Sequence, residues 1–178
     1  MELAVAKSLI EQGIDQQLPN QVWADLGSGE GLFTNALADI LPSGSKIVAL
    51  DRDDKAVRSI AFSRIEIALR TVKADLNHLP GDLPLCDGII MANSLHYVID
   101  QARLLDQLRL VHLKSTGTLI LIEYDLEKSN PWVPYPISKK TLGLVAAEAG
   151  FQSPVFTRAV KSRLNSSEIY AALLKPNR

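Results

Sequence analysis

The chain has 178 residues, of which 47% are hydrophobic and 22% are charged, and its formal net charge is −1. This length and balance are typical of one folded domain with a sizeable core, and they exclude a disordered chain. The near-neutral charge argues against a nucleic-acid partner. The single cysteine, Cys86, excludes an internal disulfide and leaves no zinc-binding spacing, so no metal site is predicted.

The sequence has no run of about 18 apolar residues that could span a membrane, and its start lacks the basic-then-apolar pattern of a signal peptide. Residues Met1–Gln12 instead place apolar side chains at the spacing of one helix face. We therefore expect a cytoplasmic protein that consists of a single domain over residues 1–178.

Hydrophobic periodicity and turn residues divide the chain into alternating strands and helices. The predicted helices are Met1–Gln12, Glu30–Leu41, Asp54–Ser63, Asp100–Leu113 and Ser138–Ala149. The predicted strands are Gln21–Leu26, Lys46–Leu50, Leu69–Ala74, Cys86–Ala92, Thr118–Glu123, Val155–Val160 and Glu168–Leu174. A turn is expected at residues 114–117. The alternation through Glu123 predicts an α/β fold with a doubly wound, mostly parallel sheet and helices on both faces.

The segment 22–31 carries the most specific pattern of the chain, because Asp25, Gly27, Gly29 and Gly31 alternate directly after a short apolar run. Glycines at a strand-to-helix turn allow a sharp bend and a close approach of a ligand to the backbone. A dinucleotide-binding turn has the pattern G-x-G-x-x-G, whereas here Leu32 stands at the last glycine position. The acid before the first glycine favours a cationic or hydrogen-bond-donating ligand over a phosphate.

This turn resembles the first motif of the class I S-adenosylmethionine-dependent methyltransferases. The resemblance implies a Rossmann-like, seven-stranded sheet whose last two strands form a hairpin, with the last strand antiparallel to the rest. It also implies S-adenosylmethionine as the cofactor.

Two further acids stand at the ends of predicted strands. The resemblance implies that Asp51 takes the ribose hydroxyls, because a carboxylate accepts from two neighbouring O–H donors, and that Asp75 meets the adenine amino group. Alternatively, Asp51 caps the following helix and Asp75 stabilises the loop after its strand. The predicted cofactor-binding residues are Asp25, Gly27, Ser28, Gly29, Gly31, Asp51, Arg52, Asp75, Leu76, Asn93 and Ser94.

The run Asn-Ser-Leu-His-Tyr-Val at 93–98 is similar to the segment after the fourth strand in methyltransferases of small molecules. His96 is the candidate general base, because its reference pKa of about 6.5 lies near neutrality. The alternative is that His96 only lines the pocket or donates a structural hydrogen bond. Tyr97 and Tyr124 are further candidates for positioning the acceptor.

The one break in composition is residues 129–136, which contain three prolines and two aromatic residues. The segment follows the fifth strand, and ligands of open α/β sheets bind at that edge. Because prolines fix the backbone, Trp132 and Tyr135 are predicted to form a wall of the substrate pocket. The alternative is a rigid connection that packs Trp132 on the core.

These features predict an enzyme that methylates a small molecule at oxygen or carbon. One alternative is a catalytically silent or partner-dependent subunit that binds S-adenosylmethionine, and a second copy or another protein would then complete its pocket. A lesser alternative is an RNA or protein methyltransferase. The spacing of Tyr124 and Lys128 also matches the Tyr-x-x-x-Lys pair of short-chain dehydrogenases, although the glycine spacing does not.

Overall fold

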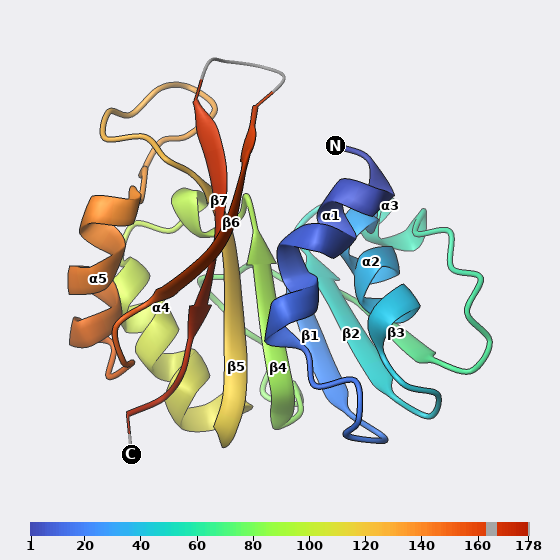
Figure 1. The fold of residues 1–178 in the computed structure, drawn as a ribbon. Coiled ribbons are helices and arrows are strands. Elements are labelled where there is room, and N and C mark those ends of the chain that lie inside the picture. Colours follow the sequence, from blue (N-terminus) through green and yellow to red (C-terminus); the bar gives the residue numbers. More distant parts are fainter. Residues whose placement is uncertain (163–166, 178) are drawn as a thin grey trace.

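The computed structural model of the chain describes residues 1–162 and 167–177. In it, seven strands form one sheet in the order β3-β2-β1-β4-β5-β7-β6 (Figure 1). Strands β1 to β5 pair in parallel, and β7 runs antiparallel to both of its neighbours. The bounds are β1 Val22–Leu26, β2 Lys46–Asp51, β3 Ala68–Lys73, β4 Cys86–Ala92, β5 Leu113–Tyr124, β6 Val155–Lys161 and β7 Glu168–Leu174. The predicted fold class is confirmed.

Helices cover both faces of this sheet (Figure 1). Their bounds are α1 Leu3–Ile10, α2 Leu32–Ile40, α3 Asp54–Arg58, α4 Gln101–Gln107 and α5 Lys139–Glu148, with short turns of helix at η1 Glu11–Gly13, η2 Leu95–Tyr97 and η3 Leu108–His112. Among the described residues, no helix is long and apolar enough to cross a membrane.

Strand β5 shows how period-two alternation builds two cores. Leu119 and Leu121 belong to the apolar cluster that includes side chains of α4 and α5. Ile120 and Ile122 point to the other face and join the cluster that includes side chains of α1 and α2. A central strand of this kind is apolar on both faces.

The connection between α4 and β5 differs from the prediction. The predicted helix Asp100–Leu113 ends as the wider helical turn η3, and the expected turn at 114–117 lies within the longer strand β5. The pairing of β5 with β4 shifts between Cys86 and Gly88, so the extra residues are accommodated as an irregularity in the ladder.

Helix α3 is also shorter than predicted, since it ends at Arg58 and not at Ser63. The backbone N–H of Ser59 closes the last turn. Beyond it, Ile60 lies over the glycine turn, where a Cβ on Gly31 would be 2.6 Å from its Cγ2 atom. Tertiary packing of this segment therefore replaces the last helical turn.

Tyr124 is the last residue of β5, and the residues that follow it up to Lys128 are not helical. A Tyr-x-x-x-Lys pair acts from one face of a helix. The dehydrogenase alternative is therefore wrong.

Candidate functional site

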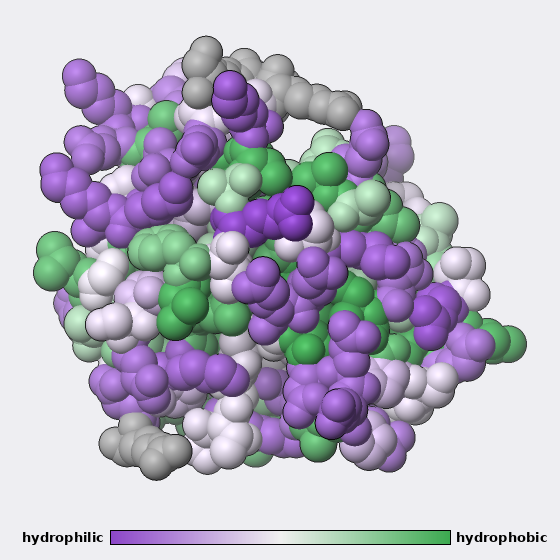
Figure 2. All heavy atoms as spheres, viewed as in Figure 1, coloured by the Kyte–Doolittle hydropathy of each residue, from purple (hydrophilic) through white to green (hydrophobic). Residues whose placement is uncertain are grey.

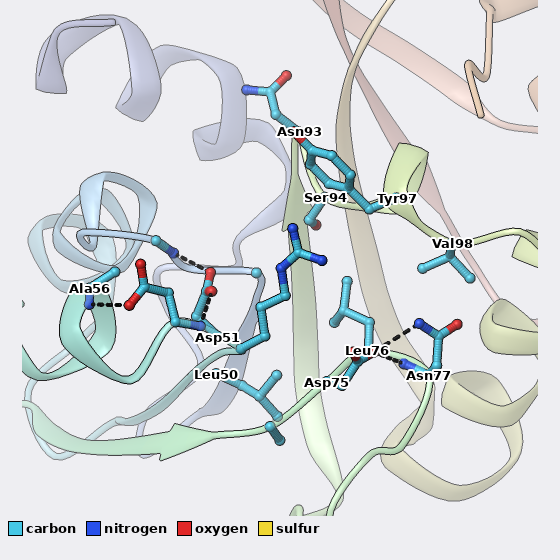
Figure 3. Close-up of a pocket in the computed structure, with 15 residues that line it drawn as sticks. Leu50, Asp51, Ala56, Asp75, Leu76, Asn77, Asn93, Ser94, Tyr97 and Val98 are labelled. Carbon is cyan, nitrogen blue, oxygen red and sulfur yellow. Dashed lines mark hydrogen bonds between the residues drawn. The ribbon is translucent and has the colours of Figure 1, made fainter. Parts of the chain in front are cut away.

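A cavity of about 330 Å³ opens where the parallel strands end. Figure 3 shows the residues around it, with Asn93 and Tyr97 on one side, Asp51 on another, and Leu76 and Asn77 opposite Asp51. We call it the strand-end cavity. Its lining residues are Gly27, Gly29, Leu50, Asp51, Arg52, Asp53, Ala56, Ala74, Asp75, Leu76, Asn77, Asn93, Ser94, Tyr97 and Val98. The structure thus brings together eight of the predicted cofactor-binding residues, namely Gly27, Gly29, Asp51, Arg52, Asp75, Leu76, Asn93 and Ser94.

The three glycines of the turn all adopt positive φ, for different reasons. A Cβ on Gly27 would lie 2.4 Å from the Cβ of Ser94, and one on Gly31 would press on Ile60. Packing therefore requires glycine at these two positions. A Cβ on Gly29 would meet nothing within 4 Å, although its φ is 52°. Gly29 is the glycine that presents bare backbone to open space.

Asp51 ends β2 and faces this turn. Its Oδ2 accepts a hydrogen bond of 2.8 Å from the backbone N–H of Gly29, and its Oδ1 accepts one of 2.9 Å from that of Asp53. Asp53, and not Asp51, caps α3, because its side chain accepts from two backbone N–H groups of the helix. The capping alternative for Asp51 is therefore wrong, and its carboxylate lines the cavity.

Asp75 lines the cavity and also stabilises the loop after β3. Its Oδ1 accepts hydrogen bonds of 2.8 Å from both the backbone N–H and the side-chain amide of Asn77. These bonds hold the pKa of the Asp75 carboxyl below its usual value. Both interpretations of Asp75 are thus compatible, since no hydrogen bond from the described residues reaches Oδ2.

Arg52 reaches across the cavity toward the segment after β4. Its guanidinium carbon lies 5.5 Å from the centroid of the Tyr97 ring, a cation–π distance. Ser94 fixes the other end of that segment, because its hydroxyl donates a hydrogen bond of 2.7 Å to the carbonyl of Leu26. The end of β1 and the segment that follows β4 are therefore held together at the cavity.

Asp25, Ser28 and Gly31 were predicted as cofactor-binding residues, but they do not line the cavity. Asp25 is 1% exposed, and its Oδ2 accepts a hydrogen bond of 2.6 Å from Thr34. Burial raises the pKa of its carboxyl to about 7. Among the described residues, the buried side-chain oxygens without a hydrogen-bond partner are Oδ1 of Asp25, Oγ of Ser28 and Oδ1 of Asn93.

A second cavity of about 610 Å³, which we call the aromatic cavity, adjoins the first. It is lined by Asn93, His96, Tyr97, Tyr124, Asn130, Trp132 and Val133. Asn93 and Tyr97 line both cavities. Three predicted substrate-pocket residues therefore lie together here, whereas Tyr135 does not line the cavity.

His96 forms a buried pair with a residue that the sequence analysis missed. Its Nδ1 lies 2.6 Å from Oε2 of Glu123, and the backbone N–H groups of Ser94 and His96 donate to Oε1 of the same carboxyl. No described residue bonds the other ring nitrogen, Nε2. The signal for Glu123 was available, because it is an acid that follows four consecutive apolar residues in a buried strand.

Residues 129–136, which we call the proline segment, are hydrogen-bonded to the turn that carries His96. The backbone N–H of Tyr135 donates to the carbonyl of His96 at 3.0 Å, and the side chain of Gln101 donates to the carbonyl of Tyr135 at 2.8 Å. Val133 packs on the core, whereas Trp132 is 80% exposed. The alternative that packs Trp132 on the core is therefore wrong.

A family model described as a methyltransferase domain matches residues 24–121, which is more than half of the chain. The chain belongs to this methyltransferase family. The match begins within β1 and ends within β5. It therefore contains two segments that line the strand-end cavity, namely the glycine turn after β1 and the segment after β4. The family predicted from the glycine turn is confirmed.

Solved structures share the whole fold. CalO1, a methyltransferase in calicheamicin biosynthesis in its SAH-bound form, is 20% identical with a TM-score of 0.67, and the match covers 98% of this chain and 54% of that one. A SAM-dependent methyltransferase from Aquifex aeolicus is 20% identical with a TM-score of 0.65, and the match covers 98% of this chain and 99% of that one. The mitomycin 7-O-methyltransferase MmcR is 14% identical with a TM-score of 0.63, and the match covers 96% of this chain and 53% of that one. The chain thus spans about half the length of CalO1 and MmcR. No curated protein sequence matches it.

At these identities the likeness shows the fold, and together with the family it supports the predicted cofactor, S-adenosylmethionine. The strand-end cavity fits that molecule chemically. It offers the carboxylates of Asp51 and Asp75 to hydroxyl and amino donors, and the open space beside Gly29 admits a ligand against the backbone. The unpartnered oxygen of Asn93, which lines the cavity, suits the cationic end of the ligand.

Proposed function

We propose that this protein transfers the methyl group of S-adenosylmethionine to an oxygen or an acidic carbon of a small molecule. The observation that carries the proposal is the junction of the two cavities at Asn93 and Tyr97, with the His96–Glu123 pair beside it. A cofactor in one cavity and an acceptor in the other would meet at this junction.

The strand-end cavity would hold the cofactor through groups from four strand ends. Asp51 would accept from the ribose hydroxyls while it keeps its bonds to the backbone. Oδ2 of Asp75 would accept from the adenine amino group, with Leu76 beside the base. Gly29 and Asn93 would contact the methionine end. When bound, S-adenosylmethionine supplies an electrophilic methyl group, so the protein must align the acceptor and exclude water.

His96 would act as the general base. Because Nδ1 donates to the Glu123 carboxylate, the neutral ring carries its lone pair on Nε2. Glu123 in turn is fixed by the two backbone N–H groups that it accepts. This arrangement orients the ring and stabilises the imidazolium that forms when Nε2 takes the acceptor proton.

The aromatic cavity would hold the acceptor. The rings of Tyr97 and Tyr124 lie 4.4 Å and 6.2 Å from the ring of His96, measured between centroids, and Trp132 completes the wall. Such rings favour a flat, partly apolar acceptor. MmcR, which has the same fold, is a 7-O-methyltransferase, and this supports oxygen as the methylated atom.

The test is transfer of labelled methyl from S-adenosylmethionine to a panel of phenols, aliphatic alcohols and compounds with an acidic C–H bond. We expect wild-type transfer to at least one acceptor. In His96→Asn the rate should fall about 100- to 10,000-fold with little change in affinity for S-adenosylhomocysteine, and the acidic limb of the pH–rate profile should disappear. His112→Asn is the matched control, because His112 is also buried but lines neither cavity.

If His96→Asn raises the KM of the acceptor with little effect on kcat, His96 only lines the pocket. A folded wild type that binds S-adenosylhomocysteine and methylates no acceptor in the panel would favour the silent-subunit alternative over the proposal.

A further inference from the structure

A third cavity, of about 360 Å³, adjoins the aromatic cavity. We call it the N-terminal cavity, and its lining residues are Met1, Glu2, Val5, Leu32, Phe33, Asn93, Tyr124, Val160, Lys161, Ser162 and Ile169. It shares Asn93 and Tyr124 with the aromatic cavity. The mechanism proposed above does not use the rest of its lining.

The interior of the N-terminal cavity is apolar. Val5, Leu32, Phe33, Val160 and Ile169 all belong to, or pack against, the core cluster on the α1 and α2 face of the sheet. They come from α1, α2, β6 and β7, which converge here (Figure 1). In Figure 2, hydrophobic side chains gather between the start of α1 and the β6–β7 hairpin.

The charged lining residues do not select an anion. Glu2 and Lys161 carry opposite charges, and both are exposed. A ligand with a charged tail would meet charges of both signs at this exposed edge. An uncharged apolar chain would instead bury its surface against the five apolar side chains.

We propose that the acceptor is an elongated molecule, with a hydroxylated aromatic ring in the aromatic cavity and an uncharged apolar chain that passes Tyr124 into the N-terminal cavity. This inference rests on the proposed function, because it places the reacting hydroxyl beside His96. The N-terminal cavity is then the site that selects among phenols by the length and polarity of their chain.

The test is calorimetric titration of phenol, 4-propylphenol and 4-hexylphenol into the protein saturated with S-adenosylhomocysteine. Each methylene buried in the cavity should tighten binding about fourfold. We therefore expect affinity to rise steeply along the series, with one molecule bound per chain. Equal affinities for the three phenols would overturn the inference.

Val160→Trp is designed to fill the N-terminal cavity. It should abolish the dependence on chain length and leave the affinity for phenol and for S-adenosylhomocysteine unchanged. Val155→Trp is the matched control on the same strand, because Val155 is 59% exposed and does not line the cavity. If Val160→Trp does not fold, Val5→Phe on α1 tests the same space.

The two claims fail in different ways. Rising affinity along the series without methyl transfer to any of the phenols would contradict the proposed function and leave the chain-binding site standing. Methyl transfer to phenol with affinities independent of chain length, or unchanged chain-length dependence in a folded Val160→Trp protein, would overturn the chain-binding site alone.

Discussion

At the scale of single residues, the glycine turn separates packing from ligand approach. Gly27 is fixed by its contact with Ser94, so a larger side chain there would disturb the fold before it could report on a ligand. Gly29 has open space beside it and a backbone N–H that is bonded to Asp51. Only Gly29 therefore tests whether the turn approaches the cofactor.

We expect Gly29→Val to weaken binding of S-adenosylhomocysteine at least about tenfold, because a β-branched residue tolerates positive φ poorly and its side chain would occupy the ligand's space. Isothermal calorimetry measures the affinity. Gly81→Val is the control, since Gly81 also has open space beside it but lies outside the cavity. Normal binding by Gly29→Val would mean that the turn does not touch the cofactor.

Asp25 predicts a pH dependence of stability. Burial raises its pKa from 3.8 to about 7, so between these values the folded protein keeps a proton that the unfolded chain has released. The contribution of Asp25 to stability is therefore full at low pH and is lost as the pH rises toward 7. Relative to Asp25→Asn, the free energy of unfolding of the wild type should fall by about 1 to 3 kcal/mol between about pH 5 and about pH 8.

Urea denaturation at the two pH values measures this difference. A difference between wild type and Asp25→Asn that does not change with pH would show that Asp25 titrates normally.

The positions of residues were predictable where a backbone pattern fixes them. The positions of Asp51 and Asp75 at strand ends follow from the order of strands, and both side chains line the cavity. Asp25 was placed at the right turn, but no sequence pattern shows that its carboxyl lies beneath the turn with Thr34. Glu123 was missed because its partner, His96, is brought to it by strand pairing and not by spacing along the chain.

At the scale of elements, the proline segment positions Trp132 at the wall of the aromatic cavity. Tyr135 ties the segment to the His96 turn, and buried Val133 ties it to the core. The indole itself is 80% exposed, so it contributes little to folding. Because it also lines the aromatic cavity, the indole is placed where it could contact a ligand.

Trp132→Ala should therefore leave the thermal midpoint and the affinity for S-adenosylhomocysteine unchanged while it weakens acceptor binding about tenfold, through loss of a large apolar contact. Leu144→Ala is the control, because Leu144 is a similarly exposed apolar residue on α5 that lines none of the three cavities. A marked loss of stability in Trp132→Ala, with unchanged acceptor binding, would show that Trp132 stabilises the fold and does not contact the acceptor.

Element existence was predictable from periodicity, but two boundaries were not. Helix α3 stops early because Ile60 packs over Gly31, which is a contact between distant parts of the chain. The segment 114–117 contains turn-forming residues, yet it lies within β5 as an irregular stretch between Leu113 and Thr118, which both pair with β4. Tertiary contacts override local preference at both places.

At the scale of the whole molecule, the topology follows from the alternation of strands and helices, because parallel strands require crossover helices on the faces of the sheet. The same topology gathers the strand ends at one edge and so predicts where the site lies. The N-terminal cavity was not predictable, because it is formed by α1, α2, β6 and β7, which are far apart in sequence.

The most direct test of the account is calorimetric titration of S-adenosylhomocysteine into the wild type and Asp51→Asn. We expect saturable binding near the micromolar range, about −8 kcal/mol, and a loss of about 1.5 to 3 kcal/mol in Asp51→Asn, the size of a hydrogen bond to a charged group. Asp54→Asn, which lies outside the lining, should bind like the wild type. A folded wild type that does not bind, or an Asp51→Asn protein that binds equally well, would contradict the central claim that the strand-end cavity is the cofactor site.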